Sequence, residues 1–392
     1  MSEEDIRHAS PEQIGFGRLF SGERQFENFA RMQDRLRVTR MAPSSRPFAF
    51  DEGARMSLPA IYRQDGQPKS LAALIDETDT TALLVIKDGT VRYEDYRLSG
   101  GRDVQWLSMS VAKSFVSALV GIAHSEGAIS SLEAPIDRYV PTLAGSAYAG
   151  VRILDVLQMS SGARWNEDYS DPDSEIFRLA AALAPGGSYD AFMASMPRAC
   201  SPGTLCQYNS ADTQALAMLV RGATGRSLTS YMEEKICEPL GMEAPSFWVA
   251  DSHGVEMAFA GLLMTARDFA KLGELYRNGG MWQGRRIVPA DYVRASVVHG
   301  APHLAPGKPL VGGHAFPMGY GYQWWLPDGG CGEFSAIGIY NQFVYVDPSR
   351  DTVIVKLSAN PHYGLSHDDA DNRDWENILG LRAIAEAFDE VA

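Results

Sequence analysis

The sequence predicts an α+β fold in which both ends of the chain build one antiparallel sheet flanked by helices, with a mainly helical domain inserted between them. Apolar, β-rich segments occur early in the chain and return at residues 343–357. In the middle, helical stretches alternate with Gly and Pro. Because early and late strands can share one sheet, this arrangement is the most economical one.

The N-terminal part contributes two expected features. Residues 1–55 carry charged clusters and a Pro-flanked stretch, so we expect them to form an extension on the surface. The apolar segments Ala82–Ile86 and Val91–Tyr96 then flank Lys87-Asp-Gly-Thr90, a strong hairpin turn signal. This hairpin marks the start of the sheet.

Helices are predicted from periodicity and from end signals. Residues 110–126 place apolar or small side chains at helical spacing with little charge and stop before Gly127, which predicts a buried helix. A capping-box-like Thr265-Ala-Arg-Asp268 opens an amphipathic helix that continues to Tyr276. Further helical stretches are expected at residues 153–159, 212–222, 227–236 and 375–390.

These elements divide the chain into three parts. Residues 1–55 form the N-terminal extension, residues 56–130 and 260–392 form a discontinuous sheet domain, and residues 131–259 form the helical domain. We expect the active site to lie between the two domains.

Composition excludes several classes of function. The 392 residues are 45% hydrophobic and 21% charged, as in an ordinary globular protein. The formal net charge of −14 disfavours nucleic acid and anionic membranes as partners. Met1–Phe16 lacks the basic and apolar regions of a signal peptide, so we expect a cytoplasmic location. The longest apolar stretch, Phe115–Ala123, is about half of a membrane span, and no transmembrane helix is expected.

No metal or other cofactor is expected. The four cysteines fit no zinc pattern; Cys200 and Cys206 can bridge, but we expect a reduced pair. His299 and His303 have ligand-like spacing, yet Gly300 and Pro302 oppose the helix that would align them.

The strongest candidate for chemistry is Ser110-Val-Ala-Lys113, at the start of the buried helix. Residues three apart share a helix face, so the Lys113 amine can reach the Ser110 hydroxyl. Burial favours a neutral lysine, which can draw the serine proton, and the helix N-terminus favours negative charge on an attacked carbonyl. A single Ser-x-x-Lys is weak evidence, and a surface Lys with a buried stem is the alternative.

The second candidate is Tyr208-Asn-Ser210, between a Pro-Gly loop and the next predicted helix. A tyrosine at such a junction can point into a cleft, and a neighbouring lysine would stabilise its phenolate for proton transfer. The alternative is a core tyrosine with a hydrogen-bonded hydroxyl.

Taken together, the motifs resemble those of class C β-lactamases and related esterases, and especially those of the 6-aminohexanoate-dimer hydrolases, which cut nylon oligomers. The resemblance covers roughly residues 80–360 and implies a β-lactamase/penicillin-binding-protein-like fold. The matching segments are Met109–Ser114, 156–162, Asn166–Tyr169, Tyr208–Ser210, Pro239–Met242, 260–268 and Gly338–Gln342.

The resemblance implies a role for each matching residue. Ser110 would be the nucleophile, Lys113 its activator and Tyr208 the general base and acid. The backbone N–H groups of Ser110 and Ile339 would hold the oxyanion. Substrate contacts would come from three further residues, Tyr169 (at the leaving group), Ser210 and Gly338.

Two departures from the pattern bear on the substrate. Ala336-Ile-Gly338 stands where β-lactamases carry Lys-Thr-Gly, so a cation for a substrate carboxylate is missing. Leu179–Ala182 stands where the dimer hydrolases carry an acid for the amino end of their substrate. These departures disfavour β-lactams as substrates and weaken the hypothesis that the substrate is the 6-aminohexanoate dimer. They leave room for general esterase activity.

The predicted function is therefore that of a serine hydrolase acting on small esters or amides through an acyl-enzyme on Ser110. A β-lactamase or D-alanyl peptidase is the enzymatic alternative, and a small-molecule-binding protein of the same fold is the non-enzymatic one. The α/β-hydrolase class is excluded because no Gly-x-Ser-x-Gly occurs. The physiological substrate, the preference for ester or amide and the oligomeric state, for which a homodimer is one option, stay open at this point.

Overall fold

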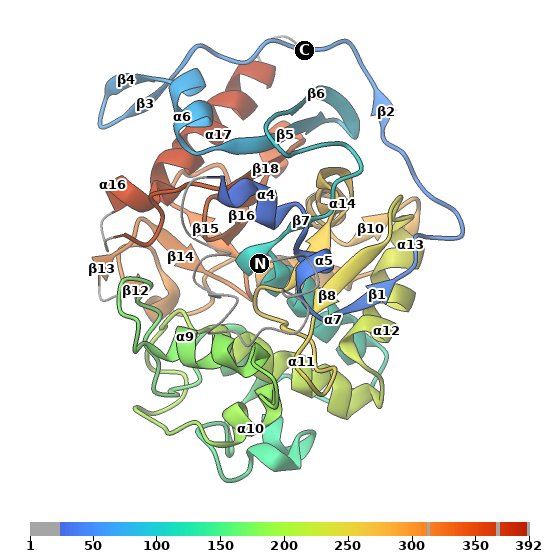
Figure 1. The fold of residues 1–392 in the computed structure, drawn as a ribbon, viewed down its shortest axis with the longest axis vertical. Coiled ribbons are helices and arrows are strands. Elements are labelled where there is room, and N and C mark those ends of the chain that lie inside the picture. The colour runs from blue at the N-terminus through green and yellow to red at the C-terminus, as the bar shows by residue number, and fades with distance from the viewer. Residues whose placement is uncertain (1–23, 312–313, 366–368, 390–392) are drawn as a thin grey trace.

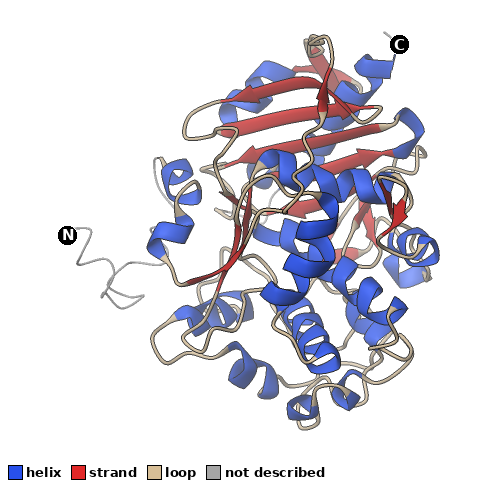
Figure 2. Cartoon of the chain, turned by 90° about the vertical axis from the view of Figure 1, so that its right-hand side faces the viewer, coloured by secondary structure: helices blue, strands red, loops and turns tan. Residues whose placement is uncertain are grey.

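A computed structural model describes residues 24–311, 314–365 and 369–389 (Figure 1). The strands of one large sheet stack in one half of the molecule, and many of the helices gather in the other half (Figure 2). The molecule thus has the α+β architecture that the sequence predicts.

The large sheet has eight strands in the order β14-β15-β16-β17-β18-β5-β6-β2. All neighbours are antiparallel except β2 and β6. The strand from the C-terminal part pairs directly with the one from the N-terminal part, through Leu84 and Val355 for example, which confirms that both ends of the chain share this sheet. The strands are β14 (Met318–Tyr320), β15 (Trp325–Pro327), β16 (Phe334–Gly338), β17 (Gln342–Asp347), β18 (Thr352–Ser358), β5 (Thr80–Lys87), β6 (Thr90–Tyr96) and β2 (Asp51–Glu52).

Helices cover both faces of this sheet, and the alternation of side chains along each strand sorts the core between them. Leu84 and Val355 belong to the hydrophobic cluster that includes helix α14 (Ala266–Arg277). Their neighbours Leu83 and Ile354 belong to a second cluster with helix α17 (Asp374–Asp389). Since both faces are buried, the strands read as nearly continuous apolar runs.

The two strongest local predictions are confirmed. The hairpin between β5 and β6 turns at Asp88 and Gly89, whose φ angles of 52° and 73° are those of the turn that matches strand twist. A short 3₁₀ turn (Met109–Val111) leads into helix α7 (Ala112–Ser125), whose residues are buried from Ala112 to Ala123. Gly127, with φ of 79°, lies just beyond the helix end as expected.

The middle of the chain is mainly helical, and helix α11 packs against helix α7. Thr265 caps α14 by accepting a hydrogen bond from the Asp268 N–H, as its capping motif predicts. The helices of the middle are α8 (Ile153–Leu157), α9 (Glu175–Ala180), α10 (Tyr189–Ala194), α11 (Ser210–Thr224), α12 (Leu228–Met232) and α13 (Glu238–Leu240), with a π-helical turn at Glu233–Cys237.

A second sheet of four strands, in the order β1-β8-β9-β7, was not predicted. Strand β7 (Trp106–Leu107) ends three residues before Ser110, so this sheet fixes the position of the backbone that leads to the predicted nucleophile. Strands β8 (Ser246–Val249) and β1 (Val38–Met41) pair along its outer side. The fourth strand is β9 (Leu262–Met264).

The described part of the N-terminal extension does more than cover the surface. It supplies β1 and β2, and its Phe29 and Met32 side chains are fully buried. The remaining elements are short: α4 (Gln25–Phe29), α5 (Met32–Arg35), α6 (Leu71–Glu77), α15 (Ala290–Ser296), α16 (Asp369–Asn372), and the ribbons β3 (Ile61–Gln64) with β4 (Gln67–Ser70), β10 (Met281–Trp282) with β11 (Arg285–Arg286), and β12 (Pro309–Val311) with β13 (His314–Ala315).

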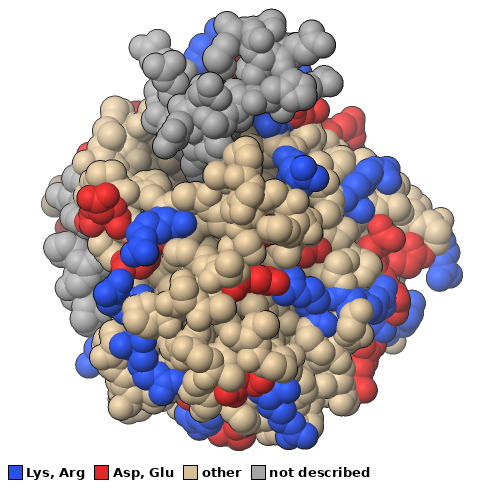
Figure 3. Space-filling model, turned by 60° about the horizontal axis from the view of Figure 1, so that its bottom comes forward, with Lys and Arg blue, Asp and Glu red and all other residues tan. Residues whose placement is uncertain are grey.

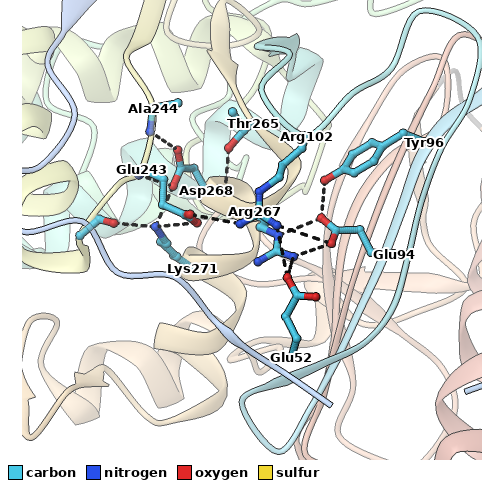
Figure 4. Close-up of polar contacts among 11 residues, drawn as sticks. Glu52, Glu94, Tyr96, Arg102, Glu243, Ala244, Thr265, Arg267, Asp268 and Lys271 are labelled. Carbon is cyan, nitrogen blue, oxygen red and sulfur yellow. Dashed lines mark hydrogen bonds and ion pairs between the residues drawn. The ribbon is translucent and has the colours of Figure 1, made fainter. Parts of the chain in front are cut away.

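An ionic network around the buried Arg267 ties β2 and β6 to α14 (Figure 4). The Arg267 guanidinium donates to Glu94 Oε1 at 2.8 Å and to Glu52 Oε1 at 2.7 Å. Burial opposes ionisation of Glu94, but the hydrogen bonds from Arg267 and Tyr96 outweigh it and hold the pKa of this carboxyl below its ordinary value. One helical turn further, Lys271 donates to Asp268 at 2.8 Å. The network joins segments that are far apart in the sequence.

Basic and acidic side chains lie next to one another on the face drawn in Figure 3. Among the ion pairs of the described residues is Arg221–Asp190, whose Nη2 and Oδ2 atoms lie 2.6 Å apart. Among the helices of the described residues, none is long and apolar enough to cross a membrane.

Candidate active site

Ser110 lies at the junction between strand β7 and helix α7, and only 6% of its surface is exposed. The preceding Met109 has φ of 46°, in the left-handed region that bulky residues rarely adopt. This backbone turn redirects the chain within one residue, from the strand into the helix. Backbone strain of this kind persists only where the surroundings enforce it, and it clusters at functional sites.

Lys113 lies one helical turn after Ser110 and is almost fully buried. Its Nζ lies within hydrogen-bond distance of Ser110 Oγ at 2.9 Å, of Ser210 Oγ at 3.0 Å and of the Phe259 carbonyl oxygen at 2.9 Å. All three oxygen atoms belong to neutral groups. Burial lowers the pKa of the Lys113 amine to about 7, and the charge of Glu167 opposes this shift. The alternative of a surface lysine is therefore wrong.

Tyr208 lies just before α11, whose N-cap is Asn209. Its ring stacks on Trp325, with centroids 5.1 Å apart, and Lys113 Nζ lies 5.1 Å from its centroid. Burial and the Glu167 charge raise the pKa of Tyr208 well above its ordinary value, while a hydrogen bond with Ser110 opposes the shift. The structure corrects the expectation that a neighbouring lysine stabilises a phenolate here: Tyr208 is a neutral phenol beside a weakly basic amine.

Gly338 ends strand β16 against the start of α7. A Cβ atom there would lie 2.7 Å from the Ser108 carbonyl oxygen and 2.9 Å from the Ser110 amide nitrogen, so only glycine permits this approach. Ile339 follows it into the turn to β17. The Gln342 side chain fixes that turn, since its Nε2 donates to the Ile339 carbonyl at 3.1 Å and its Oε1 accepts from Trp106 at 2.9 Å.

Ser210 contacts Lys113 directly, and Tyr169 contacts Glu167, the carboxylate that also binds Ser210. The Tyr169 hydroxyl donates to Glu167 Oε1 at 2.8 Å, and its ring contacts Phe177 and Tyr363 edge to face. The Ser210 hydroxyl, for which the resemblance implies a substrate contact, accepts from Lys113 and donates to Glu167 at 2.6 Å. The structure thus brings all seven predicted site residues into one region.

Glu167 is the residue that the sequence analysis did not single out. It is 4% exposed, and its carboxylate accepts hydrogen bonds from the Ser210 amide and hydroxyl, from the Tyr169 hydroxyl and from the Trp165 indole. The available signal was its place in the Asn166–Tyr169 motif. Its burial, which glutamate rarely shows unless it is paired or hydrogen-bonded, is visible only in the structure.

Other expected positions are also defined. Ala336 is buried on β16 and offers no charge, and Leu179, Ala180 and Ala182 are buried at the end of α9 and just beyond it. The four cysteines are separate free thiols. Within the described residues, no cluster of three or more His, Cys, Asp or Glu side chains could hold a metal ion.

The fold and this centre define a protein of the β-lactamase and penicillin-binding-protein fold class. A family model described as Beta-lactamase matches residues 71–376. The chain belongs to this family and is one of its hydrolases.

Two kinds of relative support this placement. The 6-aminohexanoate-dimer hydrolase of Paenarthrobacter ureafaciens is 33% identical over 328 residues, which are 81% of this chain and 81% of that protein. A Bacillus anthracis structure assigned by its name to the 6-aminohexanoate-dimer hydrolases superposes with a TM-score of 0.83 at 24% identity, covering 95% of this chain and 96% of that one. A family VIII carboxylesterase superposes with a TM-score of 0.59 at 16% identity, covering 80% of this chain and 94% of that one. At these identities the two structures show the shared fold.

Proposed function

We propose that the protein is a serine hydrolase that cleaves small ester or amide bonds through an acyl-enzyme on Ser110. The observation that carries this proposal is the 2.9 Å contact between Ser110 Oγ and a buried lysine amine. A serine hydroxyl is a weak nucleophile unless an adjacent base removes its proton. Lys113 is such a base, because its pKa near 7 leaves a large neutral fraction at neutral pH.

The protons are divided between Lys113 and Tyr208 according to their pKa shifts. Neutral Lys113 accepts the Ser110 proton as the hydroxyl attacks the carbonyl carbon. Tyr208, whose pKa is raised, stays protonated and is suited to donate its proton to the leaving group. The Tyr208 phenolate formed at that moment is short-lived, since the nearby Lys113 ammonium can return a proton. For deacylation, a water molecule attacks the acyl carbon, its proton passes through the Tyr208 hydroxyl to neutral Lys113, and the resulting ammonium returns a proton to Ser110 Oγ as the acyl bond breaks.

The oxyanion would be held by the backbone N–H groups of Ser110 and Ile339. Two features support this role. Ser110 lies in the first turn of the helical segment, where N–H groups are free of helical partners, and Gly338 lets β16 approach this turn closely. Preorganised donors of this kind are typically worth 10²–10³ in kcat.

The substrate class follows from the charges at the site. An uncharged ester or amide needs no counter-ion, whereas a β-lactam carboxylate would meet Ala336. A charge-assisted contact is worth about 1.5–3 kcal/mol, and its loss lowers kcat/KM by about ten- to a hundredfold. Tyr169, whose hydroxyl donates to Glu167, would contact the leaving group. The relation to the 6-aminohexanoate-dimer hydrolase makes short linear amides the first amides to test.

Two experiments test this proposal. A fluorophosphonate probe should label the wild-type protein covalently and leave Ser110→Ala unlabelled, because that substitution removes the nucleophile and almost no volume. Labelling of the alanine variant at the same rate would exclude Ser110. A hydrolysis screen over p-nitrophenyl esters, short linear amides, 6-aminohexanoate dimer and a chromogenic cephalosporin then ranks the substrates. A higher kcat/KM for the cephalosporin than for a short-chain ester would contradict the proposed substrate class and indicate a β-lactamase.

A further inference from the structure

The protons around Glu167 have only one possible arrangement. The Ser210 amide and the Trp165 indole both point an N–H at Oε2 of this buried carboxylate. At Oε1, 2.6 Å from Ser210 Oγ and 2.8 Å from the Tyr169 hydroxyl, the carboxylate can only accept. The hydroxyl proton of Ser210 must therefore point at Glu167, away from Lys113.

This arrangement also fixes the protons of Lys113. A neutral amine has two N–H donors and one lone pair, and Lys113 has three polar neighbours. The Phe259 carbonyl can only accept. Ser210 Oγ, whose proton is committed to Glu167, can also only accept from the amine. Both N–H groups are then used, and the lone pair is left for the third neighbour, the Ser110 hydroxyl.

We propose that Glu167 is a positioning residue that, through the Ser210 hydroxyl, aims the lone pair of neutral Lys113 at Ser110. The inference rests on the proposed function, because it assigns Lys113 the role of proton acceptor for Ser110. Glu167 touches neither the nucleophile nor the reacting carbonyl in this scheme. It acts by removing the one competing donor from the base.

Substitution by glutamine would reverse the hydroxyl of Ser210. The Ser210 amide and the Trp165 indole remain donors, so the glutamine amide oxygen must face them and its NH₂ group must face Ser210 Oγ. The hydroxyl then accepts from glutamine and can donate its own proton to Lys113. The lone pair of Lys113 is occupied, and Ser110 loses its base.

The charge of Glu167 provides a second readout. It raises the pKa of Lys113 against the effect of burial. The other ionisable groups around this carboxylate are Tyr169, Tyr208, Asp212 and Tyr320, whose pKa values the same charge raises. Without the charge, Lys113 should lose its proton at lower pH, so the rising limb of the pH–rate profile should move toward acid. Mere loosening of the site would admit water to Lys113 and move the limb the other way.

The experiment is a double-mutant cycle between Glu167→Gln and Ser210→Ala, with ester hydrolysis measured on the alkaline plateau. We expect Glu167→Gln to lower kcat by about 10²-fold, which is the ordinary contribution of a general base. In the Ser210→Ala background, which has no competing hydroxyl, the same substitution should cost less than about threefold. An equal loss in both backgrounds, or a limb that moves to higher pH, would overturn the proposal.

A control separates this inference from the proposed function. If Ser110→Ala keeps its activity, the proposed function fails; if Ser110→Ala is inactive while Glu167→Gln is not, only the inference fails. Thermal unfolding shows whether each variant folds. Should Glu167→Gln not fold, Ser210→Ala alone decides: it must lower kcat about tenfold or more, since a neutral Lys113 then lacks one acceptor and its lone pair is no longer directed. A rate within about threefold of wild type would refute the proposal.

Discussion

Hydrolysis should depend on pH through one group that must be deprotonated, with an apparent pKa near 7. Burial lowers the pKa of Lys113 from the ordinary 10.5 to about 7. A lysine at its ordinary pKa would be about 0.03% neutral at pH 7, so burial raises the neutral fraction about 10³-fold. Since the neutral amine is the active form, kcat/KM should rise about 30-fold between pH 5.5 and 8.5 and then level off.

The assay is ester hydrolysis followed by acid release in a pH-stat, because a p-nitrophenol product titrates in the same range. Thermal unfolding over the same pH values checks that the fold is unchanged. Asp212 is a second buried group whose pKa is near 7, raised by burial and lowered in part by its hydrogen bonds from Ser161 and Tyr148. If Lys113 is the titrating group, Asp212→Asn should keep the rising limb of the pH–rate profile. A profile that is flat, that falls with pH, or that loses its limb in Asp212→Asn would refute the role of Lys113.

Three further substitutions give defined outcomes. Tyr208→Phe keeps the ring on Trp325 and should lower kcat by about 10²–10⁴-fold without changing the thermal midpoint; a lower midpoint with unchanged kcat would mean that the hydroxyl only stabilises the core. Gly338→Ala places a Cβ 2.9 Å from the Ser110 amide nitrogen and should lower kcat by about 10²-fold. The control Gly145→Ala, whose Cβ would meet no atom within 4 Å, should leave kcat unchanged. Equal effects of the two substitutions would show that the loss does not come from displacement of the Ser110 backbone. Arg267→Met removes the guanidinium hydrogen bonds of the partly buried Glu94 carboxylate, which keeps its hydrogen bond from Tyr96, and should lower the free energy of unfolding by about 2 kcal/mol in denaturant titration. A change below about 1 kcal/mol would show that water replaces the guanidinium.

Local sequence was sufficient wherever one short-range rule decided the structure. The hairpin at Asp88-Gly89 needs two residues that tolerate positive φ, and the chain has them between two β-rich segments. The buried helix α7 follows from its apolar periodicity and from Gly127 at its end. The motif Thr265–Asp268 predicted the N-terminal cap of α14. These elements were placed to within a few residues.

Local sequence failed where pairing partners are distant. Strands β7, β8 and β9 have two to four residues each, too few for a period to be read. Strand β8 lies within the stretch predicted to be helical, and it is a strand because β1 and β9 pair with it on either side. The same holds for β2, whose two exposed residues become a strand only by pairing with β6.

The candidate active site also has features that local sequence predicts and features that depend on distant segments. Local sequence was enough to specify the chemical groups, because Ser110 and Lys113 are three residues apart at the start of one helical segment. The joint order of the motifs was enough to identify the family. The sequence could not determine protonation. Burial lowers the pKa of Lys113 against the opposing charge of Glu167, whereas burial and that charge together raise the pKa of Tyr208. Burial is a property of packed segments that are far apart in the chain. The tertiary structure alone brought Glu167 within 2.6 Å of the Ser210 hydroxyl, and a hydrogen bond between residues 43 positions apart leaves no periodic trace in the sequence.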